Sequence, residues 1–308
     1  MPDAIGLMAC YIYGQPARGF GWTPLLQRTQ LSGTRRYFCS RRCQRIHRQT
    51  TNKGKTMVDD DALLHFSNQV TEQIDQALEA VERNKTPRNY LGASRLGEEC
   101  QRRLQYEYWH QPVDKGQHFQ GRTLRIFQFG HSFETLAIDW LRQAGFDLYT
   151  ETRDGGQFGF QALDGTLRGH VDGIFNGGPA AIAMTYPALW ECKSMNSRSW
   201  KDTVKKGVTI SKPVYAAQMA LYQAYMEEQV PGISQHPALF TAVNKDTCEL
   251  YFEQVPFDQG LAQRSSDKAV KILQACDAGE LLPRISSDAG HYICKMCPWQ
   301  QQCWEVSS

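Results

Sequence analysis

The sequence lacks any long hydrophobic run. No apolar stretch approaches the roughly 20 residues that a membrane-spanning helix needs, and the mean hydropathy is −0.51. The first residues, Met1 to Ala4, also lack the basic stretch and apolar run of a secretory signal. These absences argue against a membrane-spanning or secreted protein, and we expect a cytoplasmic location.

Without a secretory signal, disulfide bonds are not expected, although the chain contains ten cysteines. In a reducing compartment, clustered cysteines more often bind a metal ion or an iron–sulfur cluster. Apolar residues make up 41% and charged residues 21% of the chain, which is typical of a globular protein and argues against disorder. The length of 308 residues favours one large domain, or a core with an appendage.

Acidic residues are almost absent from the first 56 positions. Residues 1–56 contain ten Lys and Arg but a single acid, Asp3, and therefore carry a net charge of +9. Residues 57–308 contain 24 Lys and Arg and 31 acids, which gives a net charge of −7. A basic arm on a mildly acidic body indicates nucleic acid as a partner. The alternative is that the arm is only a solvated tail.

The polar, aperiodic segment 49–56 is typical of a linker. We therefore predict a basic N-terminal arm, residues 1–56, and a second domain, residues 57–308. The arm resembles a small phage-type zinc knuckle, but Tyr13 stands where the second cysteine of the first pair is expected. The alternative is a disordered basic leader, with Met57 as the functional start. The zinc-ligand candidates in the arm are Cys10, Cys39, Cys43 and His47.

Hydrophobic periodicity predicts alternating helices and strands after the linker. The first helix follows Asp59 and has an apolar stripe from Leu63 to Val81. Further helices are expected at 94–108, 122–144, 213–228 and 259–278. Strands are expected at 146–152, 157–162, 167–175, 188–194, 238–243 and 249–255. This order predicts an α/β core with a mixed central sheet flanked by helices.

Two acids and a lysine are expected to meet on neighbouring strands of this sheet. Glu191 and Lys193 are two positions apart on one strand, so both side chains lie on one face. Asp172 follows another strand and precedes a glycine. Carboxylates of this kind bind Mg²⁺, which stabilises the charge that develops during phosphodiester cleavage. A nearby lysine can hold, or help to deprotonate, the attacking water.

A lone Glu-x-Lys is a frequent chance pattern on surface strands, and Asp-Gly alone is usually a turn. Two further features strengthen the prediction. Gln218 and Tyr222 lie four residues apart, on one face of the helix that follows. Gly130 and Glu134 lie in a helix before the strands, where a glycine indicates close packing or close approach of a substrate. Glu134 is the candidate for a third metal ligand, and His131 is the alternative.

Four motifs together resemble the PD-(D/E)XK nucleases, in the RecB-like branch that includes phage recombination exonucleases and the CRISPR adaptation nuclease. They are Gly130-x-x-x-Glu134, Gly169-His-Val-Asp172-Gly, Glu191-Cys-Lys193 and Gln218-x-x-x-Tyr222. The resemblance covers roughly residues 90–305. It implies a restriction-endonuclease-like core and cleavage of DNA ends with Mg²⁺ or Mn²⁺.

The resemblance also implies a role for each matching position. The implied metal ligands are Glu134, Asp172, Glu191 and the backbone carbonyl of Cys192. Lys193 would be the catalytic lysine. Gln218 and Tyr222 would form a motif on the DNA side of the site.

Three cysteines near the C-terminus, Cys294, Cys297 and Cys303, have the C-x₂-C-x₅-C spacing of a metal centre. Zinc and iron–sulfur centres commonly use four thiolates, and the best candidate for the fourth is Cys100. Spacing alone does not separate the two kinds of centre. The resemblance favours a [4Fe–4S] cluster that staples a helical periphery around the nuclease core and closes a loop of about 200 residues.

The function implied by the resemblance is that of a metal-dependent DNA exonuclease in phage or prophage recombination, or in DNA-end processing. Its substrates would be linear duplexes or single-stranded ends in a bacterial cytoplasm. A single-strand annealing protein and self-association into an oligomer are further expectations. The alternatives are a CRISPR-adaptation-type nuclease and a non-catalytic DNA-binding protein organised by zinc.

Overall fold

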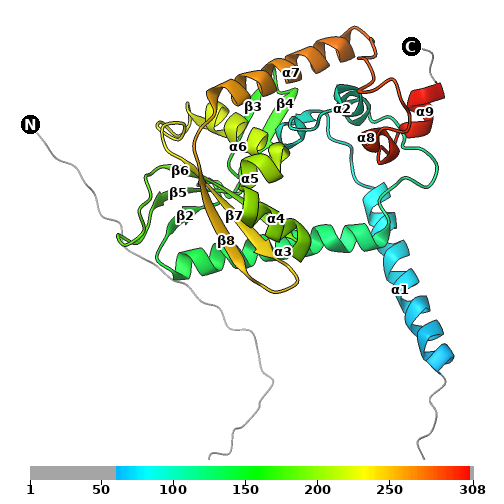
Figure 1. Cartoon of the computed structure of the whole chain (residues 1–308), viewed down its shortest axis with the longest axis horizontal. Helices are drawn as coiled ribbons and strands as arrows, with labels where there is room; N and C mark the ends of the chain where they lie inside the picture. Colours follow the sequence, from blue (N-terminus) through cyan, green and yellow to red (C-terminus); the bar gives the residue numbers. More distant parts are fainter. Residues whose placement is uncertain (1–59, 306–308) are drawn as a thin grey trace, which may run out of the picture. The chain divides into compact units, whose positions relative to one another are not determined.

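The computed structural model describes residues 60–305 (Figure 1). The zinc-ligand candidates of the N-terminal arm, Cys10, Cys39, Cys43 and His47, lie outside these residues. The α-helices are α1 (Asp60–Arg83), α2 (Gln101–Tyr108), α3 (Gly121–Gln143), α4 (Ser197–Lys206), α5 (Val208–Ser211), α6 (Pro213–Met226), α7 (Gln259–Asp277), α8 (Tyr292–Lys295) and α9 (Gln300–Glu305). A short 3-10 helix, η1, spans Ala93–Arg95. None of the helices in 60–305 is long and apolar enough to cross a membrane.

The strands of residues 60–305 form two sheets. They are β1 (Leu91–Gly92), β2 (Asp147–Tyr149), β3 (Gly159–Ala162), β4 (Leu167–His170), β5 (Gly173–Gly177), β6 (Ala188–Met195), β7 (Ala238–Asn244) and β8 (Leu250–Val255). The larger sheet has the order β2-β5-β6-β7-β8, and the smaller has the order β1-β4-β3. In the larger sheet β6 and β7 are parallel, and the other neighbours are antiparallel. The predicted α/β class with a mixed central sheet is therefore confirmed.

Helices cover both faces of the larger sheet, because residues along β6 alternate between two hydrophobic clusters. Trp190 packs with Ala137 and Leu141 of α3 on one face. Leu189 packs on the other face with a cluster that includes Met219 of α6. The connection from β6 to β7 contains α4, α5 and α6, as a crossover between parallel strands requires.

The single strand expected at 167–175 is wrong. Strand β4 ends at His170 in the smaller sheet, and β5 begins at Gly173 in the larger sheet. Between them, the Val171 backbone N–H donates to the carbonyl of Phe158 at 2.9 Å, and the Val171 side chain is fully buried. Residues before and after the break are buried, so the apolar pattern of the sequence runs through it. Hydrophobic periodicity therefore could not show where the strand divides.

The helix expected at 94–108 is interrupted. The 3-10 helix η1 ends at Arg95, and α2 begins only at Gln101, after an extended Cys100. Gly97 lies against α6: a Cβ there would stand 2.4 Å from the Cα of Val214. This close approach of two backbones requires a glycine and stops the first helix short. The break places Cys100 at the N-terminal end of α2.

The first predicted helix is present as α1, but its apolar stripe is exposed. Leu63, Phe66 and Val81 are 55%, 66% and 64% exposed. The C-terminal half of α1 contacts α3 through polar groups instead. Asp75 pairs with Arg125. The stripe therefore does not contribute to the core of residues 60–305.

The contact between Gly97 and Val214 leaves no room for a side chain at position 97, so a larger residue there should destabilise the protein. Gly97→Ala should lower the free energy of unfolding by about 1–3 kcal/mol, because the new methyl group would push α6 away from η1. Gly92→Ala is a matched control, since the nearest atoms to a Cβ there lie 3.8 Å away. Urea unfolding of both variants measures the difference. Equal stability of the two variants would contradict this packing.

Candidate active site

Glu134, Asp172 and Glu191, here called the acidic cluster, lie where β6 runs beyond the start of β5. The two strands pair from Gly173 opposite Trp190, and β6 then continues to Met195 with no partner on that side among the described strands. The next backbone N–H that needs an acceptor there belongs to Cys192, and it donates to Asp172 Oδ2 at 2.8 Å. A carboxylate thus replaces a strand partner, and this bond fixes Asp172 beside β6.

Lys193 bridges the two acids. Its Nζ contacts Glu191 Oε1 and lies 3.8 Å from Asp172 Oδ2. Glu191 has an exposed fraction of 0%, and within residues 60–305 neither of its carboxylate oxygens has a hydrogen-bond partner apart from the lysine. A buried carboxylate with unsatisfied oxygens is costly. The arrangement therefore leaves acceptor capacity for a second cation.

Glu134 reaches this cluster from α3. It is half-buried, and burial together with the charge of Asp172 raises its pKa to about 7, although Lys193 opposes the shift. His131, one turn earlier, is exposed to solvent. A Cβ on Gly130 would meet only Ser194 Oγ, at 3.6 Å, so packing among the described residues does not require a glycine there.

The cluster has more negative than positive charge. Burial, then the charge of Asp172, raises the pKa of Glu191 to about 8, and Lys193 opposes this shift. Burial alone would lower the pKa of Lys193, but Glu191 and Asp172 outweigh it and raise that pKa. The ammonium therefore stays protonated while both carboxylates face it. It can lose a proton readily only after another cation has neutralised them.

Gln218 and Tyr222 lie on α6. They are 5% and 2% exposed, so both are buried and neither is open to solvent. The Tyr222 ring packs edge-on against Phe160, with ring centroids 5.7 Å apart. Burial, then the charge of Glu191, raises the pKa of Tyr222. A Cβ on Gly169 would stand 2.8 Å from the Tyr222 ring, which explains the glycine at this position.

One neighbour of the lysine was not found from the sequence. The ring centroid of Tyr215 lies 5.5 Å from Lys193 Nζ. Tyr215 precedes Gln218 by three residues on the same helix, and this spacing could have pointed to it.

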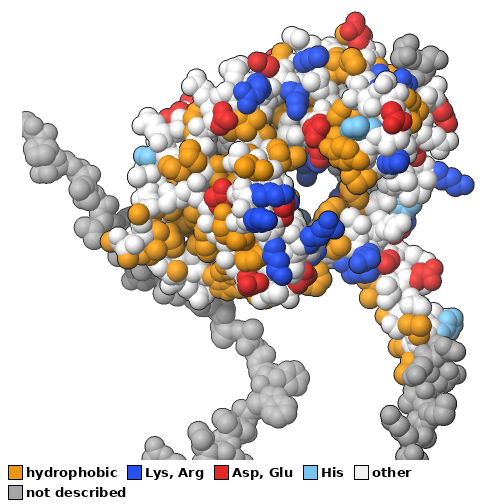
Figure 2. Space-filling view, in the orientation of Figure 1, with side chains coloured by type: hydrophobic (Ala, Val, Ile, Leu, Met, Phe, Trp, Pro, Cys, Tyr) orange, Lys and Arg blue, Asp and Glu red, His pale blue; other side chains and the backbone are white. Residues whose placement is uncertain are grey.

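Lys and Arg side chains gather around an opening in the face of the molecule shown in Figure 2, near α3 and α4. Clustered positive charge of this kind attracts the phosphates of a nucleic acid.

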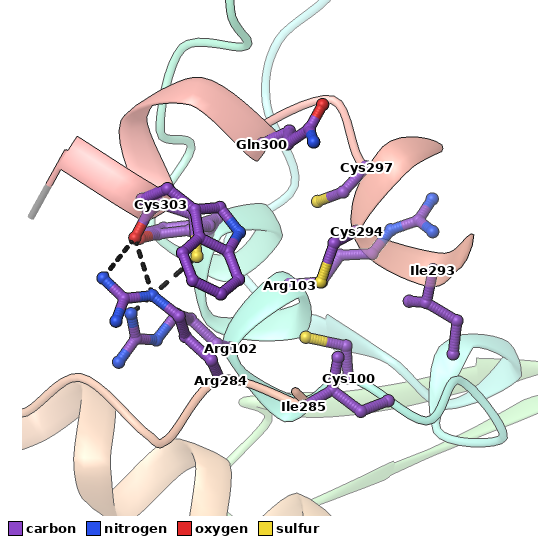
Figure 3. Close-up of a pocket in the computed structure, with 12 residues that line it drawn as sticks. Cys100, Arg102, Arg103, Arg284, Ile285, Ile293, Cys294, Cys297, Gln300 and Cys303 are labelled. Carbon is purple, nitrogen blue, oxygen red and sulfur yellow. Dashed lines mark hydrogen bonds between the residues drawn. The ribbon is translucent and has the colours of Figure 1, made fainter. Parts of the chain in front are cut away.

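The four predicted cluster cysteines line one cavity. They come from the start of α2 (Cys100), from α8 (Cys294), from the turn after it (Cys297) and from α9 (Cys303). Figure 3 shows the sulfur atoms of Cys100, Cys294 and Cys297 turned toward a shared space, with Cys303 on another side of it. In residues 60–305, no group of three or more Cys, His, Asp or Glu is arranged so that it could hold a metal ion as it stands.

Arginines surround this cavity. Arg102, 4% exposed, points Nη1 at Cys303 Sγ at 3.8 Å and donates from Nε to the carbonyl of Leu282 at 2.5 Å. Arg284 donates twice to the carbonyl of Cys303, at 2.8 and 3.0 Å, and Arg103 also lines the cavity. Neutral thiols do not need this positive charge, whereas a centre of four thiolates carries a negative charge that it would offset.

Contacts between protein groups also hold the C-terminal segment in place. Trp299 is buried, and its Nε1 donates to the carbonyl of Gln111 at 2.8 Å. The Gln301 backbone N–H donates to Asp114 Oδ2 at 2.6 Å, at the start of α9. The ring of Trp304 packs under Arg284 at 4.7 Å and lines the cavity. Trp304 is thus the tryptophan that lies beside the cysteines, and Trp299 anchors the segment before α9.

The remaining described cysteines lie outside this cavity. Cys192 and Cys276 are buried. Cys248 is exposed in the turn between β7 and β8, with a positive φ of 61°.

Solved structures with a similar backbone include an alkaline exonuclease, LHK-Exo, from Laribacter hongkongensis. It shares 16% identity over 62% of this chain and 89% of that chain, with a TM-score of 0.42. Its complex with dAMP gives 15% identity, the same two coverages and a TM-score of 0.42. A protein named SSO0001 shares 16% identity over 74% of this chain and 93% of that chain, with a TM-score of 0.41.

No family model and no curated protein matches the sequence. At these TM-scores the similarity to solved structures carries no argument about function, which the side chains of the site have to supply.

Because the pKa of Glu134 is raised, its ionisation should lower the free energy of unfolding of the metal-free protein. The folded state prefers protonated Glu134, so wild-type stability should fall relative to Glu134→Gln as pH rises from about 4.5 to about 7. Above that range the variant should be more stable by on the order of 2 kcal/mol, after allowance for partial exposure.

Urea unfolding in EDTA at pH 4 and pH 8 measures this difference. Asp139→Asn, which changes an exposed carboxylate on the same helix, is the matched control and should show no such dependence. Parallel pH profiles for wild type and Glu134→Gln would remove Glu134 from the acidic cluster.

Proposed function

We propose that the protein is a metal-dependent nuclease that hydrolyses phosphodiester bonds at DNA ends. The observation that supports this most directly is the buried carboxylate of Glu191, whose oxygens have no partner other than Lys193 among the residues that the structure describes. Asp172 and Glu134 lie beside it and add to the same negative charge. Carboxylates and one lysine in this arrangement match the needs of cation-assisted phosphodiester hydrolysis.

The proposed ligands for Mg²⁺ or Mn²⁺ are the side chains of Glu134, Asp172 and Glu191 and the backbone carbonyl of Cys192. When bound, the cation supplies charge stabilisation for the phosphate oxygens. Asp172 is already oriented by the Cys192 N–H. Lys193 would hold the attacking water and help to remove its proton once a bound cation has neutralised the carboxylates that face the ammonium.

Gln218 and Tyr222 have a supporting role in this proposal. Both are buried on α6, and the charge of Glu191 raises the pKa of Tyr222, which supports a place for this motif beside the acids. The Lys and Arg side chains around the opening in Figure 2 would contact the DNA backbone. Binding should then weaken with salt, since each neutralised phosphate releases counterions.

The finer assignment is an exonuclease that processes linear duplexes or single-stranded ends, in phage or prophage recombination, with a single-strand annealing protein as a partner. The division into an N-terminal arm, residues 1–56, and a nuclease domain, residues 57–308, is part of the same proposal. Zinc binding by the arm would involve Cys10, Cys39, Cys43 and His47.

The second part of the proposal is a [4Fe–4S] cluster held by Cys100, Cys294, Cys297 and Cys303. Four thiols line one cavity, and their donor chemistry suits either iron–sulfur or zinc. The guanidinium of Arg102 beside Cys303 Sγ fits a centre with negative charge. The role would be structural, because the centre would join the start of α2 to α8 and α9 across most of the described chain.

Removal of the lysine or of the buried acid should abolish cleavage. Lys193→Met and Glu191→Gln should each lower the rate by about 10²–10⁴-fold while leaving the fold intact, because each removes a group that acts on the water or the cation. The matched control is Lys271→Met, an exposed lysine on α7, which should keep nearly the wild-type rate.

The assay is digestion of linear duplexes labelled at either terminus, with Mg²⁺ or Mn²⁺. Circular dichroism verifies the fold of each variant. Wild-type rates in a clean preparation of either variant would end the assignment of these residues.

Metal analysis and visible absorption of anaerobically purified protein distinguish the proposed centres. We expect iron and sulfide with a brown chromophore. Cys100→Ser and Cys297→Ser should lose the chromophore and unfold at a lower temperature, because the link between α2 and the C-terminal helices is lost. Cys248→Ser, which changes an exposed cysteine outside the cavity, should behave as wild type. A colourless, zinc-loaded protein would replace iron–sulfur with zinc, and a metal-free folded protein would contradict both.

A further inference from the structure

We propose that Tyr215 is a positioning residue that holds the ammonium of Lys193 over its ring when a divalent cation occupies the acidic cluster. This inference rests on the proposed nuclease function and goes one step further, since it assigns a residue that no sequence motif marked. It rests on three points. These are the groups that face the Lys193 ammonium, the contact that holds the Tyr215 ring, and the oxygens for which a divalent cation and the ammonium compete.

Three groups face the Lys193 ammonium in the described part of the chain. Glu191 contacts it, Asp172 lies 3.8 Å away, and the Tyr215 ring centroid lies 5.5 Å away. The first two are carboxylates that a metal ion would also bind. The third is a π-face, which attracts a cation within about 6 Å and does not bind Mg²⁺ as an oxygen ligand would.

The ring of Tyr215 is held by the sheet. It stacks on Phe240 of β7, with centroids 6.2 Å apart and an interplanar angle of 25°. Phe240 is fully buried and is the register partner of Glu191 on the neighbouring parallel strand. Side chains of register partners lie on the same face, so the tyrosine, the acid and the lysine share one surface of the sheet. The position of the ring relative to Glu191 is therefore set by strand pairing.

A divalent cation and the ammonium compete for the same oxygens. Mg²⁺ or Mn²⁺ at Glu191 and Asp172 brings two positive charges to the place where Lys193 Nζ now contacts the acid. The ammonium would be repelled from Glu191, but it has to stay close to the water that it orients. The ring face of Tyr215 lies within reach of the ammonium and can bind it, and the metal ion does not bind there.

The test compares Tyr215→Phe, which keeps the π-face and loses the hydroxyl, with Tyr215→Leu, which loses the ring. At saturating Mg²⁺, Tyr215→Leu should lower kcat by about 3- to 30-fold with little change in the KM for DNA, in line with a cation–π contact. Tyr215→Phe should stay within about 2-fold of wild type. In a Lys193→Met background, Tyr215→Leu should cause no further loss.

Tyr225→Leu is the matched control for the loss of an aromatic ring from α6. Tyr225 stacks on Phe160 with centroids 4.6 Å apart and does not touch the lysine, so this variant should lose stability but keep kcat. If Tyr215→Phe falls as far as Tyr215→Leu, or if Tyr215→Leu retains the wild-type kcat, the proposal is overturned.

A second measurement does not depend on cleavage. In metal-free protein, Tyr215→Leu should destabilise the wild type more than it destabilises Lys193→Met, because the ammonium–ring contact exists only in the former. Additive effects on urea unfolding would overturn the contact itself. A wild type that cleaves no DNA, together with non-additive stabilities, would instead overturn the nuclease proposal and with it the positioning role of Tyr215 in cleavage.

Discussion

The structure around the site depends on one buried ionic contact, that of the Lys193 ammonium with the carboxylate of Glu191. A fully buried carboxylate without a counter-charge would be very unfavourable. Here the lysine is paired with two acids, and it remains charged because both of them raise its pKa against the effect of burial. A buried ion pair of this kind on a central strand lowers the stability of the protein, and such a loss of stability is typical of functional sites.

The break between β4 and β5 makes this contact possible. Had 167–175 formed one continuous strand, β6 would have been paired along its length, and the N–H of Cys192 would have bonded to backbone. Because the chain leaves the sheet at Asp172, a carboxylate accepts that N–H beside the end of β6 that β5 does not pair. The same break brings Asp172 close enough to Glu134 and Glu191 for its charge to raise the pKa of both.

The cysteine cavity lies at a second junction between distant parts of the chain. Backbone and side-chain bonds already attach α9 to the segment after α2, through Gln111 and Asp114. Arginines then supply positive charge beside the sulfur atoms. These two features explain why thiols that are almost 200 positions apart in sequence can line one space, and why the surroundings suit an anionic centre.

The sequence by itself determined the class of the fold, most of the helices and strands, and the residues whose chemistry points to a nuclease. These follow from local periodicity and from short spacings, such as Glu191-x-Lys193, that one strand or helix can satisfy alone. Only the tertiary structure decided where the predicted strand divides, that Cys100 stands at the start of α2 instead of inside a helix, that Gln218 and Tyr222 are buried, and that Tyr215 faces the lysine. Each of these depends on contacts between elements far apart in the chain, such as Gly97 against Val214, and local pattern contains no information about which backbones will meet.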